Sequence, residues 1–372
     1  MMSALAARDQ LHLLHGSCDL LEWWRRFAKD NPFLAKAGHL LRSYARVAKK
    51  TGESTSNGIC WLCLAGTDGV VFENFNLHPE WSHTMYDSLP WRELPPFFRA
   101  LGCSDEDTTL PQCLFFDCWH NFHGGLGKHM VASTAVEVLQ NMGQGNLQTR
   151  VQQLNDAYEA WREVSKLKLH CGRLDKELFG IESGTMACPT GTWSKFNDTR
   201  ILMSFLEHFL SNNGQQYVAT RITREALAGI RAANVCFRTC YSSGFWMTAA
   251  EAERAGAAGL HFLASYSRVA MWALEEGRIR YPMMPKAHYL HHSFRDMFLA
   301  GRSGSTWCQN ALSSSVQMDE DFIGQIARLS RRVGSQLLMQ RTVQRYLLAL
   351  HLELYDEDSA PSSSRKPCVQ MP

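Results

Sequence analysis

The stretch that decides the fold runs from Cys113 to Met142 and reads CLFFDCWHNFHGGLGKHMVASTAVEVLQNM. Its first four residues are apolar and predict a short buried strand that ends at Asp117. A glycine-rich turn follows, and the residues from Lys128 to Met142 then have the apolar spacing of a helix. We therefore expect a strand, a tight turn and a helix in succession, which places polar side chains at the carboxyl end of a strand.

Most of the remaining chain is predicted to be helical, with a small β component. Apolar residues recur at helical spacing from Leu11 to Lys49, around a break at the proline of Asp30-Asn31-Pro32. A helical block extends from Asn146 to Arg278, with a further strand predicted at 70–72. Breaks in the block are expected at 171–172, 188–191, 211–214 and 242–244, and later helices at 286–299 and 318–354.

Composition and charge limit the function classes. The chain has 372 residues, of which 45% are hydrophobic, and this is enough for a well-buried core. Lys and Arg number 38 against 36 Asp and Glu, so the formal charge is only +2. Overall charge therefore does not indicate a nucleic-acid binder, and any DNA contact has to come from local basic patches.

The sequence predicts an intracellular protein that is neither secreted nor membrane-embedded. The first fourteen residues lack the basic start, apolar run and cleavage site of a secretory signal, and no later stretch is apolar over the length of a bilayer. The twelve cysteines are scattered in apolar settings over a large chain. Buried free thiols explain them better than a disulfide framework.

The densest candidate site is Asp117 with the histidine at 120, beside the predicted glycine turn. An acid and an imidazole at the carboxyl end of a strand are typical of a ligand site in an open α/β sheet. The glycines match neither a phosphate loop nor a dinucleotide fingerprint. The alternative is that Asp117 caps the turn and the neighbouring histidines only pack.

Cys60 and Cys63 have the spacing of a zinc knuckle and so predict half of a zinc site. A complete site needs two further ligands, and His78, His83 and Cys103 are candidates among which the sequence does not choose.

His288 and His292 are four residues apart and share one face of the predicted helix. Two histidines at this spacing can bind zinc, but the glutamate of the zinc protease motif is missing between them. We therefore favour a Lys/His-rich surface that binds anions, with Lys286 as its cation.

A third cluster, Asp319, Glu320 and Asp321, opens the last predicted helix, and Arg331 and Arg332 follow it. Acids in a first turn suit the helix dipole, which is sufficient to explain them. The alternative is that Glu320 or Asp321 projects toward a neighbouring sheet.

Several of these stretches together resemble the transposase-like open reading frames of dinoflagellates, which are related to DDE transposases of the CACTA and hAT kind. In those transposases the second catalytic aspartate has a histidine three residues later, as Asp117 has His120. The likeness extends over most of the chain. The segments that carry it are 28–40, 58–66, 79–81, 90–91, 117–120, 285–288 and 319–322.

The resemblance implies an RNase H-like α/β core interrupted by a large helical insertion. Its catalytic acids would be Asp30, Asp117 and Glu320, holding two Mg²⁺ or Mn²⁺ ions for phosphodiester cleavage or strand transfer. His120 would orient this site. Residues near the DNA phosphates would be Lys286, His288, Arg331 and Arg332.

The resemblance also implies how the chain is divided, and one segment departs from the family's pattern. The core's first part would be 1–144, with the Cys-x-x-Cys region, the helical insertion 145–280, and the rest of the core 281–355. Composition separately predicts a disordered tail at 356–372, which is rich in Ser and Pro. Residues 20–29 read as helix where the family has its first strand, so the chain resembles the back portion of a longer transposase.

Three function classes follow from these expectations. The first is a transposase-derived nuclease, active or decayed. Its expected partner is DNA, and its expected intracellular location includes the nucleus. The second is a non-catalytic helical interaction protein that keeps a decayed transposase fold. The third is a nucleic-acid-binding module stabilised by zinc at Cys60 and Cys63.

Overall fold

The computed structural model describes residues 34–36, 38–46, 58–104, 106–107, 110–143, 145–181 and 188–359. The chain forms two compact units, Met1–Ser315 and Val316–Pro372. The predicted boundaries at 144 and 280 both fall inside the first unit. Asp30 and most of the helical segment predicted between Leu11 and Lys49 lie outside the described residues.

The described part of the chain is mainly helical, as predicted. Its only strands are β1 (Trp246–Met247) and β2 (Cys308–Gln309), which pair antiparallel with Trp246 opposite Gln309. An RNase H-like core therefore stays a prediction. The helices of the first unit are α4 (Pro96–Ala100), α5 (Gly127–Asn141), α6 (Leu147–Ser165), α7 (Asn197–Asn212), α8 (Gly214–Tyr217), α9 (Arg221–Ser242), α10 (Ala249–Glu275) and α11 (Lys286–Arg302).

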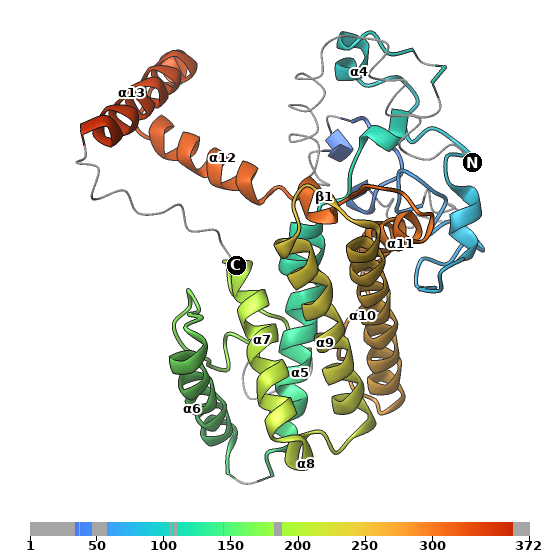
Figure 1. The fold of residues 1–372 in the computed structure, drawn as a ribbon, viewed down its shortest axis with the longest axis vertical. Coiled ribbons are helices and arrows are strands. Elements are labelled where there is room, and N and C mark those ends of the chain that lie inside the picture. The colour runs from blue at the N-terminus through green and yellow to red at the C-terminus, as the bar shows by residue number, and fades with distance from the viewer. Residues whose placement is uncertain are drawn as a thin grey trace. The chain divides into compact units, whose positions relative to one another are not determined.

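Helices α5, α7, α9 and α10 run side by side and enclose the larger of two hydrophobic cores (Figure 1). The rings of Phe122 and Phe237 pack together within it, with centroids 4.0 Å apart. Sequence caps set where the longest helices begin. Thr220 and Thr248 each accept a hydrogen bond from the third residue of the following helix, in reciprocal capping boxes.

Helix α11 packs unusually close to α10, and this contact fixes the position of the histidines on α11. A Cβ atom at Gly259 would lie 2.3 Å from the ring of Phe294, and one at Gly256 would lie 2.4 Å from the backbone nitrogen of Phe298. Only glycine permits this separation between the two helices. The sequence of α10 therefore determines how deeply α11 enters the fold.

The strand predicted before Asp117 is absent, and this expectation is corrected. Residues 110–113 form a short 3-10 helix (Leu110–Cys113), and 114–117 have no regular secondary structure and no neighbouring strand among the described residues. The carbonyl of Phe116 accepts instead from the hydroxyl of Ser314, 3.0 Å away. The apolar run reflects burial in the second hydrophobic core, not pairing in a sheet.

The predicted glycine turn is also different in the structure. A π-helix, Trp119–Leu126, leads directly into α5, with a non-helical backbone only at Gly125. A Cβ atom at Gly125 would lie 2.7 Å from Cδ of Lys286. This glycine therefore serves close packing against α11 and does not reverse the chain.

Two other predicted elements differ from the structure. Residues 70–72 form no strand, because Val70 is held in a local turn by hydrogen bonds with Thr67 and Gly66. The helical block is interrupted at 166–196, where Lys166 ends α6 in the left-handed conformation (φ 61°). The described residues of that interruption form turns, bends and segments without regular secondary structure.

The last predicted helix is two helices, α12 (Gln317–Ser330) and α13 (Leu338–Ser359), which make up the described part of the second unit. The chain leaves α12 through Arg332, which has a positive φ of 61°, and passes Gly334. Helix α13 continues into the predicted tail as far as Ser359, and residues 360–372 lie outside the described part.

The segment 58–117 contains little regular structure, although it encloses the second hydrophobic core. Its helices are the 3-10 helix Glu80–Thr84, α4 and the 3-10 helix Leu110–Cys113. Buried aromatic residues such as Trp61, Trp81 and Phe98 form this core together with Tyr289 of α11. Few backbone hydrogen bonds of helix or sheet stabilise the segment, so other interactions have to hold it.

Candidate metal centre

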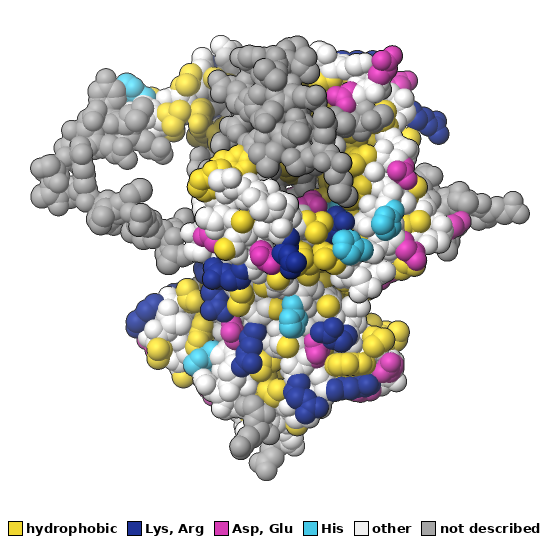
Figure 2. Space-filling model, turned by 45° about the vertical axis from the view of Figure 1, so that its right-hand side comes forward, with side chains coloured by type: hydrophobic (Ala, Val, Ile, Leu, Met, Phe, Trp, Pro, Cys, Tyr) yellow, Lys and Arg dark blue, Asp and Glu magenta, His cyan; other side chains and the backbone are white. Residues whose placement is uncertain are grey.

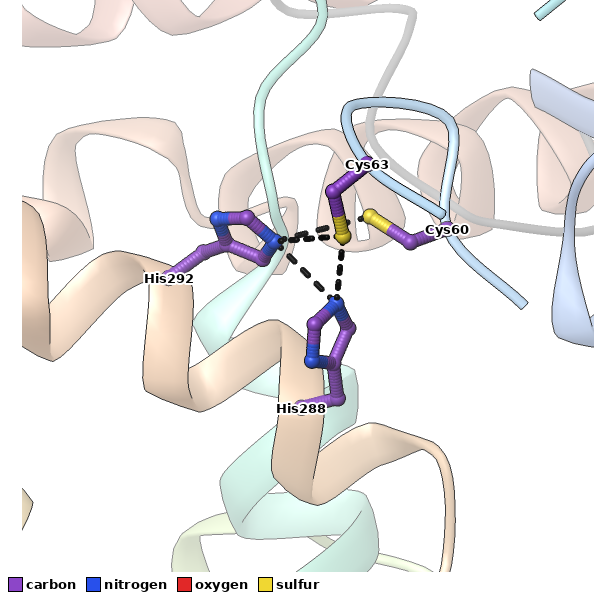
Figure 3. Close-up of side chains that lie close together, drawn as sticks. All are labelled: Cys60, Cys63, His288 and His292. Atoms are coloured by element: carbon purple, nitrogen blue, oxygen red, sulfur yellow. Dashed lines mark hydrogen bonds between the residues drawn. The ribbon is translucent and has the colours of Figure 1, made fainter. Parts of the chain in front are cut away.

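Two pairs of predicted ligands come together in the structure. Cys60 and Cys63, on a loop, face His288 and His292 on α11 (Figure 3). The Sγ atom of Cys63 lies 3.3 Å from Nε2 of His288 and 3.6 Å from Nε2 of His292, and Sγ of Cys60 lies 3.6 Å from Nε2 of His292. The two Nε2 atoms are 3.1 Å apart. All four side chains are fully buried.

These distances match a tetrahedral zinc site. With Zn–S bonds of about 2.3 Å and Zn–N bonds of about 2.0 Å, tetrahedral geometry separates nitrogen and sulfur ligands by about 3.5 Å and two nitrogens by about 3.3 Å. The four ligand atoms of the structure all lie within 4.8 Å of one another. The cluster can therefore hold a metal ion such as zinc without rearrangement of its loops.

The loop that carries the cysteines has the hydrogen bonds of a metal-binding turn. The amide of Leu62 donates to Sγ of Cys60 at 3.4 Å, and the amide of Ile59 donates to the carbonyl of Ala65 at 2.9 Å. A positive φ of 82° at Gly66 lets the chain reverse after the second cysteine. These bonds fix both sulfurs on one side of the turn.

Arg42 holds this loop through hydrogen bonds to its backbone. Its buried guanidinium donates to the carbonyls of Cys60 (3.2 Å), Trp61 (3.0 Å) and Ser88 (2.8 Å). Burial lowers the pKa of Arg42, and the nearby sulfurs of Cys60 and Cys63 act in the opposite direction. Arg42 thus combines a hydrogen-bonding clamp with positive charge close to the two thiol groups.

Helix α11 holds the histidines and also binds the loop directly. Tyr289, between them, donates its hydroxyl to the carbonyl of Ile59 at 2.7 Å. The ring of Trp81 packs against both imidazoles, with centroids 4.6 Å from His288 and 4.3 Å from His292, and Phe116 stacks on His292. Aromatic side chains therefore enclose the centre and separate it from water.

The electrostatics of the cluster favour the ligand forms of Cys60 and His292, whereas Cys63 is favoured as the protonated thiol while no metal is bound. Burial raises the pKa of Cys60, but the donating Cys63 thiol and the imidazoles of His292 and His288 outweigh it, so the pKa lies well below its usual value. Burial and the Cys60 sulfur raise the pKa of Cys63. Burial also lowers the pKa of His292 to about 4, which leaves a neutral imidazole at physiological pH.

The second ring nitrogens of the histidines depart from the usual zinc-site pattern. Metal-binding histidines commonly donate their other N–H to a carboxylate or carbonyl. Here the Nδ1 atoms of His288 and His292 are buried and have no hydrogen-bond partner among the described residues. Ring packing, mainly by Trp81, orients these imidazoles instead.

The sequence singled out both pairs of residues but did not join them, and it favoured an anion-binding surface over a metal site for His288 and His292. Cys60 and Cys63 were one candidate half of a zinc site, and the structure places His288 and His292 beside them in place of His78, His83 or Cys103. His288 is fully buried against the cysteines, which corrects the expectation that it lies on an anion-binding surface. A sequence signal for joining the two pairs did exist, because each pair supplies two possible zinc ligands and a tetrahedral site needs four.

Asp117 and His120 form a separate contact. The Asp117 carboxylate accepts from the amides of Trp119 (2.9 Å) and His120 (3.2 Å) and lies against Nδ1 of the His120 ring. Asp117 is buried, whereas His120 is partly exposed. Hydrogen bonds from these two backbone amides are typical of a capping aspartate, which was the alternative interpretation of Asp117 in the sequence. Lys286 lies beside the pair and donates to the carbonyl of His120 at 2.9 Å.

The proposed triad of acids is not brought together by the described residues. Asp30 lies outside them, the side chain of Glu320 is not described, and Glu320 belongs to the second unit. Arg331 and Arg332 are exposed in that same unit. The Mg²⁺ or Mn²⁺ site and the DNA contacts therefore stay predictions.

Many basic side chains of the helical bundle are paired with acids. Arg221 lies 3.0 Å from Glu275, and Arg268 contacts Glu225 from the neighbouring helix. On the face drawn in Figure 2, Lys and Arg side chains alternate with Asp and Glu. Mixed charge of this kind does not favour a phosphate-binding surface there.

The described cysteines and helices agree with the remaining expectations. All ten cysteines in the described ranges have free thiols, and six of them are buried. No helix in those ranges has the length and apolar character needed to cross a bilayer.

Comparison with protein-family models, curated proteins and solved structures found no match. The resemblance to dinoflagellate transposase-like sequences therefore stays a prediction.

Proposed function

We propose that this protein binds one Zn²⁺ ion through Cys60, Cys63, His288 and His292, and that the ion fastens the irregular segment 58–117 to the helical bundle. The observation that carries the proposal is the fit of four buried nitrogen and sulfur atoms to one tetrahedral centre. In this proposal the protein is a zinc-stabilised helical scaffold, the class closest to the predicted zinc-stabilised module.

The donor set favours zinc over the hard cations expected for a nuclease. Thiolate and imidazole ligands suit Zn²⁺, whereas Mg²⁺ and Mn²⁺ prefer carboxylate, carbonyl and water oxygens. The centre contains two sulfurs and two nitrogens and no carboxylate. Magnesium and manganese therefore have no place in it.

Four protein ligands favour a structural role for the ion. Catalytic zinc sites keep one coordination position open for water or substrate, but structural sites fill all four with side chains. Cys60 and His292 are completely shielded from solvent, as are their two partners. Under this proposal the ion stabilises the fold and does not activate water.

Metal content and Co²⁺ spectroscopy test the proposal. The purified full-length chain is expected to contain one zinc per molecule, and Co²⁺ substitution should give the visible absorption of a tetrahedral site with two sulfurs and two nitrogens. Cys63→Ser and His292→Asn should each lose the stoichiometric metal, because three remaining ligands hold zinc weakly.

Matched controls come from the same residue types elsewhere in the chain. Cys171 and His261 are both exposed and outside the cluster. Cys171→Ser and His261→Asn should keep one zinc and the unchanged cobalt spectrum. A wild-type protein that binds no zinc, or a Cys63→Ser variant that retains it, would overturn the proposal.

A second candidate is the phosphodiester chemistry that the transposase resemblance implies. One specific observation supports it: the Asp117 carboxylate lies directly against the His120 imidazole, with Lys286 adjacent. Calorimetric titration of Mn²⁺ into the zinc-loaded chain and into Asp117→Asn tests this candidate. Manganese binding lost in the variant would support it, and equal binding or none in both would count against it.

A further inference from the structure

Lys128, in the first turn of α5, is a half-buried cation whose charge is not offset by an acid of the described chain. Its Nζ atom lies over the rings of Phe196 and Trp193, 5.2 Å and 5.5 Å from their centroids. No carboxylate in the described ranges forms an ion pair with Lys128, whereas Arg268 on α10 is paired with Glu225. A charge that is partly removed from water is costly unless an opposite charge compensates it.

A second lysine adds to this excess of positive charge. Lys286, the first residue of α11, donates from Nζ to the carbonyl of His120 at 2.9 Å, and its aliphatic chain lies directly on Gly125. Burial and the charge of Lys286 lower the pKa of Lys128. The N-terminal end of α11 contributes the positive end of its helix dipole at the same place. Two ammonium groups therefore repel each other near the start of α5.

Phe196 connects Lys128 to the π-helix on which Lys286 rests. The edge of the His120 ring packs against Phe196 with centroids 5.5 Å apart, and Lys128 covers the same Phe196 ring. Asp117 accepts from backbone amides and lies against the His120 ring, and it forms no ion pair with Lys128. The acid of this region therefore orients His120 and does not neutralise Lys128.

His129 lies in the field of both lysines. Its imidazole is partly buried, and its Nδ1 atom is shielded from water with no hydrogen-bond partner in the described part of the chain. Burial and the charges of Lys286 and Lys128 lower the pKa of His129 to about 4, so the ring is neutral at physiological pH. A neutral imidazole has one N–H to donate, and shielded polar atoms are normally satisfied by a protein group, a water or an ion.

We propose that Lys128, Lys286 and His129 bind the phosphate group of a small molecule. A phosphate group carries about −1.5 to −2 charges at neutral pH, which matches two ammonium groups at the amino end of α11. A carboxylate has a single charge and would leave one lysine uncompensated. None of the three residues is a ligand of the metal centre, so this site does not depend on zinc.

The surroundings favour a small phosphate compound over a nucleic acid. A nucleic acid presents a row of singly charged phosphates and is bound by several cations along a track. Other basic side chains of the bundle are paired with acids, such as Arg278 with Glu137 and Arg221 with Glu275. Two cations that converge without such pairing at Lys128 suit one phosphate group with two charges.

Calorimetric titration of the full-length, zinc-loaded chain in phosphate-free buffer tests the proposal, with inorganic phosphate and phenyl phosphate as probes. The wild type should bind one phosphate group per chain. Lys128→Met and Lys286→Met should each weaken binding by about tenfold or more, because each removes a charge-assisted hydrogen bond. Zinc content is measured alongside, since Lys286 precedes the ligand His288 by two residues. Lys168→Met is the control, because Lys168 is exposed and outside this cluster, and its affinity should be unchanged.

Thermal unfolding distinguishes phosphate binding by Lys128 from simple packing on the aromatic rings. Phosphate should raise the unfolding temperature of the wild type and have little effect on Lys128→Met. Without phosphate, Lys128→Met should be at least as stable as the wild type, because it removes a half-buried charge that Lys286 repels. Lys128→Arg keeps the charge and should retain most of the affinity.

The comparison of probes identifies the source of the phosphate group. Tighter binding of phenyl phosphate than of inorganic phosphate would assign the site to a phosphate monoester, and equal binding would assign it to free phosphate. A wild type that binds neither probe, or a Lys128→Met variant that binds both as the wild type does, would overturn the proposal. A single-stranded oligonucleotide bound more tightly than both probes would replace the small molecule with a nucleic acid.

Discussion

The Sγ atom of Cys63 lies 3.3 Å from Nε2 of His288, although 225 residues separate the two in sequence. This contact joins a loop near the start of the described chain to the last helix of the bundle. A metal ion shared by the two residues would close a loop that contains most of the fold. Cross-links over long loops are those expected to restrict the unfolded chain most strongly.

Removal of the metal should loosen the segment 58–117 before the helical bundle. The segment has only short helices, whereas α5, α7, α9 and α10 share a large aromatic core. Hydrogen exchange of the zinc-loaded and the chelated chain should show faster exchange in 58–104 and unchanged protection in α9 and α10. Equal loss of protection in both regions would mean that the metal stabilises the whole unit cooperatively.

Arg42 should determine zinc affinity through the cysteine loop. Arg42→Met removes two hydrogen bonds to carbonyls of the cysteine loop, the bond to the carbonyl of Ser88, and the positive charge near the sulfurs. We expect about 10-fold to 100-fold weaker zinc binding, the range for loss of a residue that supports metal ligands. Competition with a chromophoric chelator measures this affinity.

The control for Arg42 is Arg92→Met, because Arg92 is exposed in the same segment. Its zinc affinity should equal that of the wild type. Affinity unchanged in Arg42→Met would show that the turn and α11 orient the sulfurs without the clamp.

The helical elements were predictable because their signals are local. Thr220 and Thr248 stand immediately before apolar spacings of helical period, and polar or glycine-containing breaks separate the helices. The prediction of a strand at 113–116 was wrong because a run of apolar residues indicates that a segment is buried, but not that it pairs in a sheet. Nothing in CLFF distinguishes a strand from an extended segment packed against Trp61 and Tyr289.

Each pair of residues in the metal centre could be singled out from the sequence, but their meeting could not, for a similar reason. The Cys60 and Cys63 spacing and the His288 and His292 spacing are each local signals. Their meeting depends on how α11 packs on α10, which is set by Gly256 and Gly259 and by the aromatic residues around Trp81. No spacing in the sequence encodes that tertiary contact.

A buried ion pair between α5 and the segment after α10 should be a major source of stability. Glu137 is buried, lies 2.6 Å from Arg278 and 3.4 Å from Arg280, and Arg280 is itself buried. Glu137→Gln would leave buried positive charge without its partner, at a cost of about 3 kcal/mol of unfolding free energy. Urea unfolding measures this change.

The control for Glu137 is Glu207→Gln, which removes the partner of Arg238. That arginine is 65% exposed, so the loss should be below about 1 kcal/mol. If both variants lost a similar amount of unfolding free energy, the ion pair of Glu137 would have to be accessible to water, in contrast to its burial in the structure.

His123 should make the protein less stable in acid. This histidine is fully buried in the bundle, where Tyr241 contacts its Nε2 atom at 3.2 Å. Burial, with the nearby charge of Arg200, lowers its pKa to about 3 in the folded protein, against about 6.5 in the unfolded chain. Between these values the unfolded state binds a proton that the folded state does not, so stability falls as pH decreases.

The magnitude follows from the same linkage. Below pH 6.5 the contribution of His123 approaches about 1.4 kcal/mol per pH unit and ends near pH 3, where the folded protein is protonated too. His123→Gln removes this proton uptake and keeps a side chain that can accept from Tyr241. Unfolding free energies measured at pH 7, 6 and 5 should fall less steeply in the variant, by about 1 kcal/mol between pH 6 and 5. The metal centre and all other histidines are common to both proteins, so parallel pH profiles would mean that His123 already takes up its proton in the folded state.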